Sequence, residues 1–85
     1  MASYRLLIKP SAAKELENFS LKDRKRVATR IQRLASDPRP AGADKLSGQD
    51  KYRVRQGNYR ILYSVDDAGL TVLIVKIGHR REVYR

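Results

Sequence analysis

The sequence contains no cysteine and only one histidine among its 85 residues. Without cysteine the chain can form no disulfide, has no thiolate nucleophile and cannot build a cysteine-based zinc site. One histidine leaves no compact set of metal ligands, and no glycine-rich phosphate loop occurs. We therefore expect no metal and no cofactor, so any chemistry must come from the side chains themselves.

Acidic residues and long hydrophobic runs are also scarce. Nineteen Lys and Arg stand against nine Asp and Glu, which gives a formal net charge of +10. Such a charge attracts polyanions, so the expected partner is a nucleic acid, a membrane surface or an acidic protein. The longest apolar run near the start, Leu6 to Ile8, is too short for a signal peptide or a membrane span. We expect a cytoplasmic protein.

The length allows a single domain, residues 1–85, with one modest core. Along the chain, the patterns follow the order strand, helix, helix and then three strands. This order predicts a small α+β domain with an N-terminal strand, an antiparallel two-helix hairpin and an antiparallel three-strand meander. The helices are expected to cover one face of the sheet and to leave the other face open.

The N-terminal third begins with a short strand. Tyr4–Ile8 is apolar, and Pro10 stops its extension while opening a helix that Lys9 or Ser11 can cap. The apolar face of that helix is formed by Ala12, Leu16 and Phe19.

A second helix is predicted from Ser20 to about Ser36. Ser20 followed by Asp23 resembles a capping box, and Pro38 ends the helical pattern. The core stripe of this helix is formed by Val27, Ile31 and Leu34. Its basic residues between Lys22 and Arg33 are interpreted as a solvated face that adds only long-range attraction.

The second half reads as three strands. Tyr52–Gln56 and Tyr59–Val65 flank the turn signal Gly57-Asn58, so they should pair as an antiparallel hairpin. A second turn at Asp66–Gly69 leads to Leu70–Ile77. This last run is nearly continuous in apolar residues, which predicts a central strand covered on both faces. The glycine at position 78 then interrupts the apolar run.

Three arginines are expected on one face of this hairpin. Arg53 and Arg55 alternate with apolar residues, and Arg60 lies across the turn from Arg55. A guanidinium offers paired donors that match phosphate oxygens and stays charged at any working pH. The hairpin can therefore bring all three to one phosphate. The alternative is that they point outward simply because this sheet face is wet.

The segment after the last strand concentrates polar and basic residues, including His79, Arg80, Arg81, Tyr84 and Arg85. Histidine titrates near neutral pH, so His79 is a candidate for proton transfer at an RNA 2′-hydroxyl or 5′-oxygen. Tyr84 can donate a hydrogen bond, stack on a base or close the core. The competing interpretation of His79 is a solvated histidine on an exposed loop.

Four short motifs in this order resemble the RelE branch of the RelE/ParE toxin superfamily. They are Lys45-Leu46-Ser47-Gly48, Tyr52-Arg53-Val54-Arg55, Gly57-Asn58-Tyr59-Arg60-Ile61-Leu62-Tyr63 and Ile77-Gly78-His79-Arg80-Arg81-Glu82-Val83-Tyr84. The resemblance implies a RelE-like microbial ribonuclease-type fold. It also implies a toxin of a type II toxin-antitoxin system, a ribosome-dependent endoribonuclease that cuts messenger RNA in the decoding site and inhibits translation. The implied partners are messenger RNA, the ribosome and a short acidic antitoxin, with no membrane.

Carried over by motif, the resemblance also implies the site residues. The catalytic set would be Arg53, Arg55, Arg60, Arg80 and Tyr84, to which the residue chemistry adds His79. The RNA-binding set would be Lys45, Lys51, Arg81 and Arg85. Where some relatives carry lysines this chain has Arg53 and Arg55, so no lysine base is available there. This difference favours His79 as the residue that transfers protons. Because the sequence ends at Arg85, a C-terminal helix present in relatives is expected to be missing or reduced.

Two alternatives stay open from the sequence. A ParE-like toxin of the same fold would bind DNA gyrase without cutting RNA, and it would not need the arginine, histidine and tyrosine set. A plain RNA-binding module, or a toxin relic without activity, would need only the positive charge.

Overall fold

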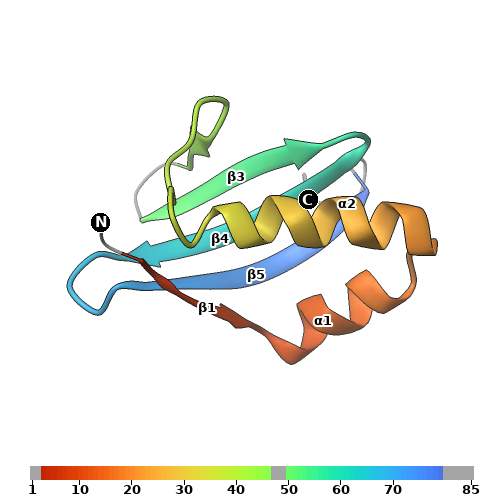
Figure 1. Cartoon of the computed structure of the whole chain (residues 1–85), viewed down its shortest axis with the longest axis horizontal. Helices are drawn as coiled ribbons and strands as arrows, with labels where there is room; N and C mark the ends of the chain where they lie inside the picture. Colours follow the sequence, from red (N-terminus) through yellow and green to blue (C-terminus); the bar gives the residue numbers. More distant parts are fainter. Residues whose placement is uncertain (1–2, 47–49, 80–85) are drawn as a thin grey trace.

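The computed structural model describes residues 3–46 and 50–79 of the chain (Figure 1). Within this part, one five-stranded sheet has the order β1-β5-β4-β3-β2. The strands are β1 (Arg5–Ile8), β2 (Asp44–Lys45), β3 (Lys51–Gln56), β4 (Tyr59–Asp66) and β5 (Thr71–His79). Strands β3, β4 and β5 pair antiparallel in sequence order. The predicted α+β architecture and its meander are confirmed.

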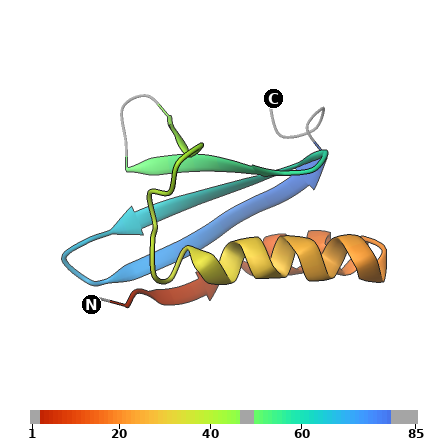
Figure 2. The ribbon, with the colours of Figure 1, turned by 45° about the horizontal axis from the view of Figure 1, so that its top comes forward.

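Two helices cover one side of this sheet, α1 (Pro10–Glu17) and α2 (Leu21–Arg33) (Figure 2). The predicted cap is confirmed, because Ser20 Oγ accepts a hydrogen bond of 3.2 Å from the backbone N–H of Asp23. Helix α2 ends before the predicted limit near Ser36. Neither helix in the described part of the chain is long and apolar enough to cross a membrane.

The core lies between α2 and the sheet. Its buried members from α2 and the following turn are Val27, Ile31 and Leu34, and those from the sheet include Tyr52, Val54, Ile61, Tyr63, Val72, Ile74 and Ile77. The prediction that β5 is covered on both faces is wrong. Val72 and Ile74 are buried whereas Leu73 between them is only half-buried, because the helices lie on one face of the sheet only.

Two strand pairings were not predicted. β1 runs parallel to β5, with Leu7 opposite Leu73, so the sheet is mixed at this edge. β2 has two residues, which pair antiparallel with the start of β3 and are too few to show a periodic pattern. Where β1 ends, the carboxylate of Glu15 on α1 accepts a 3.2 Å hydrogen bond from the backbone N–H of Ile77. Helix α1 thus satisfies part of the sheet edge that β1 leaves unpaired.

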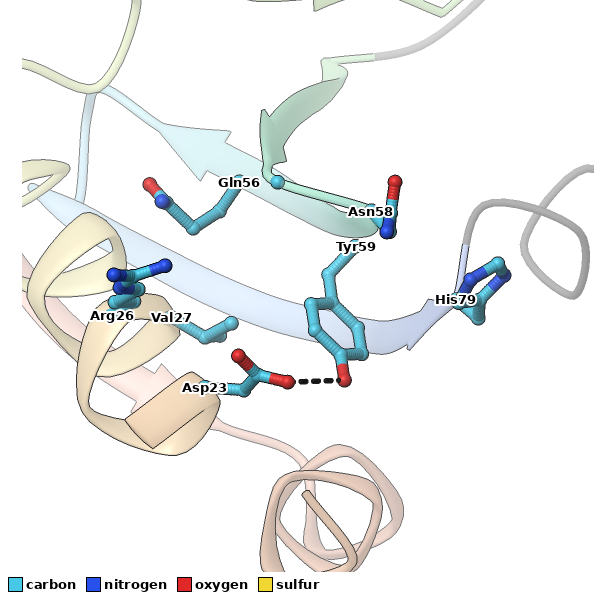
Figure 3. A pocket seen from close by; sticks show the side chains of 8 residues that line it. Asp23, Arg26, Val27, Gln56, Asn58, Tyr59 and His79 are labelled. Carbon is cyan, nitrogen blue, oxygen red and sulfur yellow. Dashed lines mark hydrogen bonds between the residues drawn. The ribbon is translucent and has the colours of Figure 1, made fainter. Parts of the chain in front are cut away.

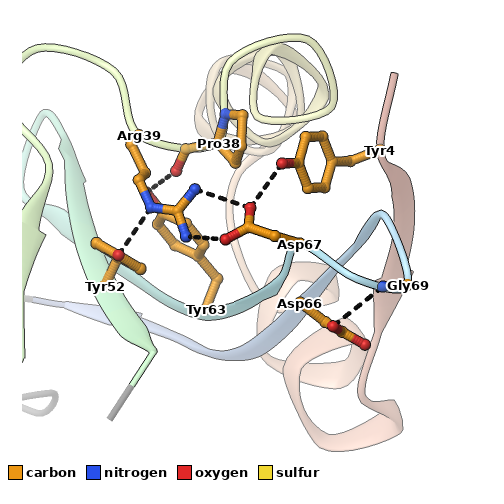
Figure 4. A network of polar contacts seen from close by, with 8 residues as sticks. All are labelled: Tyr4, Pro38, Arg39, Tyr52, Tyr63, Asp66, Asp67 and Gly69. Atoms are coloured by element: carbon orange, nitrogen blue, oxygen red, sulfur yellow. Dashed lines mark hydrogen bonds and ion pairs between the residues drawn. The ribbon is translucent and has the colours of Figure 1, made fainter. Parts of the chain in front are cut away.

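A polar network joins four segments at the end of the sheet where β4 turns into β5 (Figure 4). Arg39 donates to both carboxylate oxygens of Asp67, at 3.0 and 2.8 Å, and to the hydroxyl of Tyr52 at 2.8 Å. Tyr4 donates to the same carboxylate at 2.7 Å. The network ties the loop after α2 to the β4–β5 turn and to the chain before β1, and so orients the segment that leads to β2.

Tyr63 provides a test of this packing. Its ring is fully buried, its hydroxyl donates to the carbonyl of Pro38 at 2.8 Å, and burial raises the pKa of Tyr63 to about 12. The neutral phenol therefore stabilises the fold below pH 10.0, the ordinary value, and that contribution is lost as the pH rises towards 12. Tyr63→Phe should lower the free energy of unfolding by about 1–2 kcal/mol at neutral pH, because the Pro38 carbonyl loses its donor.

Urea unfolding of both proteins across the alkaline range checks this prediction. Above pH 10.0 the stability of the wild type should fall more steeply than that of Tyr63→Phe, which cannot ionise at this position. Parallel declines would show that other groups govern alkaline unfolding.

Candidate active site

Three arginines gather on the sheet face that the helices leave uncovered. Arg55 and Arg60 are direct cross-strand partners in the β3–β4 hairpin, and Arg53 lies two residues before Arg55 on the same face. We call these three residues the arginine cluster. Directly opposed residues of an antiparallel pair have Cβ atoms about 5 Å apart, so the guanidinium groups can reach a common anion. The prediction that the three arginines share one face of the hairpin is confirmed.

The turn between β3 and β4 explains why the arginines meet. Gly57 adopts a φ of +58°, a left-handed conformation that glycine adopts without steric cost. The tight turn fixes the register of the hairpin and places Arg55 opposite Arg60. Arg55 is exposed, the Arg53 side chain keeps 17% of its accessible surface, and Arg60 is buried at 7%.

Gly78 lies beside Arg60 on β5, as its cross-strand partner. The prediction that the last strand ends at Ile77 is wrong, because β5 continues through Gly78 to His79. Glycine has no side chain, so position 78 adds none to the arginine face.

Asp44 on β2 joins the arginine cluster and was not predicted. It is the cross-strand partner of Arg53, and its Oδ2 accepts a hydrogen bond of 2.9 Å from the Arg53 guanidinium. This hydrogen bond lowers the pKa of the Asp44 carboxyl, and the charges of Arg55 and Arg60 lower it further. The carboxylate is therefore ionised at neutral pH and is a weak base. The only signal in the sequence is an acidic residue directly before the Lys45-Leu46 motif.

The two lysines predicted to bind RNA lie on different faces. Lys51 lies two residues before Arg53 on β3, so it shares the face of the arginine cluster, and it is exposed. Lys45 is the cross-strand partner of Tyr52, whose ring is in the core. Its position therefore belongs to the opposite face.

His79 does not share the face of the arginine cluster. It pairs with Tyr59, and the two rings make an edge contact with centroids 6.2 Å apart. The Tyr59 ring packs against Phe19 at the helix layer, and its hydroxyl donates to Asp23 at 2.9 Å (Figure 3). The structure therefore does not bring His79 and the arginines together on one face. The physical reason is strand alternation, because β5 extends two residues beyond the predicted end.

His79 instead lines a cavity of about 330 Å³ between α2 and the hairpin turn (Figure 3). Arg26 and Asn58 contribute polar groups to this cavity. The hydrogen bond to Asp23 raises the pKa of Tyr59, so this phenol is a poor acid near neutral pH.

Four of the predicted site residues lie outside the described residues, namely Arg80, Arg81, Tyr84 and Arg85. Among residues 3–46 and 50–79, no group of three or more histidine, aspartate or glutamate residues could hold a metal ion. The described part of the site is therefore an anion-binding surface made of the arginine cluster and Lys51, with one carboxylate beside it. Such a surface can bind a phosphodiester and stabilise added negative charge on it.

Comparisons with known proteins agree with the resemblance in the motifs. Residues 6–84 match the family described as ParE toxin of type II toxin-antitoxin system, parDE. Toxin RelG of Mycobacterium tuberculosis is 44% identical over 34 residues, which are 40% of this chain and 39% of RelG. The matched segment thus spans about two fifths of that relative.

Solved structures match almost the whole chain. A chain of the RelBE2 toxin-antitoxin complex of Mycobacterium tuberculosis aligns with a TM-score of 0.82 and 25% identity. The alignment covers 94% of this chain and 94% of the matched chain. The isolated RelE toxin of E. coli aligns with a TM-score of 0.80 and 28% identity, covering 96% of this chain and 92% of RelE. The archaeal RelE-RelB complex of Pyrococcus horikoshii gives a TM-score of 0.80 at 27% identity, covering 92% of this chain and 96% of the matched chain. The chain belongs to the ParE toxin family of type II toxin-antitoxin systems, within the RelE/ParE superfamily.

Proposed function

We propose that this toxin is a ribosome-dependent endoribonuclease that cuts messenger RNA and thereby inhibits translation. The observation that carries the proposal is the arginine cluster on the uncovered sheet face, where Arg55 and Arg60 are cross-strand partners. Permanently charged guanidinium groups suit a scissile phosphate. RelE toxins among the structural neighbours support the same assignment.

The proposed reaction is attack of the upstream 2′-hydroxyl on the neighbouring phosphorus. A bond forms between the 2′-oxygen and phosphorus, and the bond from phosphorus to the 5′-oxygen breaks. The 2′-hydroxyl loses its proton and the leaving 5′-oxygen gains one, so the products carry a 2′,3′-cyclic phosphate and a 5′-hydroxyl. Arg53, Arg55 and Arg60, together with Arg80 from the motif, would stabilise the charge that grows on the phosphate. Arginine stays protonated at working pH, so it does not serve as the base.

The proton transfers are assigned to Tyr84 ahead of His79. The register of β5 places His79 on the helix side of the sheet with Tyr59, away from the face that holds the phosphate. Tyr84 lies outside the described residues, and its assignment rests on the resemblance of the final motif.

Comparing His79→Ala with Tyr84→Phe tests this assignment. His79→Ala should keep the cleavage rate within about threefold and keep the shape of its pH profile near neutrality, because the imidazole lies on the other face. Tyr84→Phe should lower the rate on the order of 10²-fold, since it loses the hydroxyl proton. Single-turnover cleavage on programmed ribosomes measures both. Loss of the pH dependence in His79→Ala would contradict this assignment and show that His79 carries out the proton transfer.

The proposed partners are the messenger RNA, the ribosomal decoding site and a short acidic antitoxin, in the cytoplasm and without a membrane. Two of the three solved neighbours described above come from toxin-antitoxin complexes. The net charge of +10 supports an acidic antitoxin, since a negatively charged chain would neutralise it.

Induction of the toxin in cells, with and without the neighbouring antitoxin gene, tests the proposed function. Mapping messenger RNA 5′ ends within minutes should reveal new ends inside translated codons, and the antitoxin should suppress them. Intact messages together with DNA damage would replace the nuclease with a gyrase-binding toxin. Intact messages with normal growth would leave a basic binding domain.

A further inference from the structure

A carboxylate lies within the arginine cluster that the proposed reaction uses. Asp44 belongs to the two-residue edge strand β2, directly opposite Arg53, and its Oδ2 lies 2.9 Å from the Arg53 Nη2 atom. A negative group beside a phosphate-binding surface opposes the binding of a phosphate, because like charges repel at this range. The proposed function does not use this residue.

We propose that Asp44 is an internal anion that an RNA phosphodiester must displace from Arg53, so that this carboxylate sets the affinity of the toxin for RNA. The inference rests on the proposed function, because it takes the arginine cluster to be the phosphate-binding site. It makes Asp44 an affinity-determining residue, not a catalytic one.

The exposure of the two partners supports displacement. The Arg53 side chain keeps 17% of its accessible surface, whereas the Asp44 side chain keeps 49%. The carboxylate can therefore turn to solvent while Arg53 stays in place for the incoming phosphate. The pair has one hydrogen bond, between Nη2 and Oδ2, and such a partly exposed pair is weak compared with a bidentate arginine–phosphate contact.

The electrostatics make Asp44 a permanent competitor. The hydrogen bond from Arg53, with Arg55 and Arg60 nearby, lowers the pKa of the Asp44 carboxyl. The carboxylate thus stays charged throughout the neutral range, and no change of pH in that range removes it.

The ideal probe is an RNA oligonucleotide with 2′-methoxy riboses, which keeps the phosphodiesters but lacks the attacking hydroxyl. Its affinity should rise about tenfold in Asp44→Asn, because a single charge within about 4 Å of the phosphate is removed. Asp37→Asn is the matched control, since it changes net charge equally at an exposed position in the loop after α2. The control should alter the affinity by no more than about twofold.

The salt dependence separates displacement from a structural effect. In the wild type, the released carboxylate takes up a salt cation while the bound phosphate gives one up. The slope of log affinity against log salt should therefore be steeper in Asp44→Asn, by up to about 0.7 for a single-stranded ligand. A variant that is merely better or worse folded leaves this slope unchanged, and thermal unfolding of each variant reports its folding.

Arg53→Ala completes a double-mutant cycle. In that background Asp44→Asn should gain less than about threefold, because the competed arginine is absent. Equal gains with and without Arg53, an unchanged salt slope, or weaker binding by Asp44→Asn would each overturn the inference while leaving the nuclease proposal intact. Failure of every protein to bind the oligonucleotide would overturn the inference together with the RNA-binding part of the proposed function.

Discussion

Replacing the 2′-hydroxyl of the nucleotide before the cut by hydrogen or a methoxy group should abolish cleavage. In the proposed reaction this hydroxyl is the nucleophile, so its removal leaves the phosphorus without an attacking group. Arg53, Arg55 and Arg60 remain charged at any working pH, so they do not act as nucleophiles. Cleavage should fall below detection while ribosome binding persists, since the phosphates that the arginines hold are unchanged.

The measurement is cleavage of a message carrying one modified nucleotide, on ribosomes stalled with the cut site in place. A message with the same modification one codon away is the control, and it should be cut at the normal rate. Analysis of the normal product should find a 2′,3′-cyclic phosphate. Undiminished cutting at the modified nucleotide would require water or a side chain as the nucleophile and would refute the mechanism.

Arg60→Ala should lower the cleavage rate on the order of 10²-fold, by analogy with the loss of one preorganised donor to a developing anion. Arg60 is suited to this role because it is the most buried arginine of the cluster, 7% exposed, between Arg55 on β3 and Gly78 on β5. A buried guanidinium acts in a medium of lower dielectric constant than water, so its attraction for the negative charge on the phosphate is stronger.

Two further variants sharpen the Arg60 test. Arg60→Lys keeps the charge but loses the paired donors, so its rate should lie between those of the wild type and Arg60→Ala. Arg33→Ala removes an equal charge from an exposed position at the end of α2. It should change the cleavage rate by less than about threefold. If Arg60→Ala stays folded and cuts normally, Arg60 has a structural role only.

Local sequence patterns predicted most of the fold correctly. Each of these patterns depends on residues that are close in the chain. The hydroxyl of Ser20, for example, caps α2 by accepting a hydrogen bond from the backbone N–H of Asp23, three residues later. The alternation of Tyr52 and Val54 with Arg53 and Arg55 likewise defined the two faces of β3 before any partner strand was known. The left-handed turn at Gly57 then joined Arg60 to the same face.

The candidate site was predicted less completely, because part of it depends on pairing between strands. The two residues of β2 are too few to show a periodic pattern. The place of Asp44 beside Arg53 therefore follows only from the pairing of β2 with β3. His79 was expected beyond the end of the last strand, because Gly78 interrupts the apolar run. In the sheet, Gly78 instead pairs with Arg60, and the extended strand turns His79 to the helix side.

The sequence by itself determined the α+β class, the positive charge and the arginine face, since these follow from composition and from spacings within one helix or one hairpin. Only the tertiary structure decided the parallel pairing of β1 with β5, the place of Asp44 beside Arg53 and the face on which His79 lies. The physical reason is that cross-strand register is set by contacts between distant segments. A shift of one residue reverses the face of every side chain in a strand.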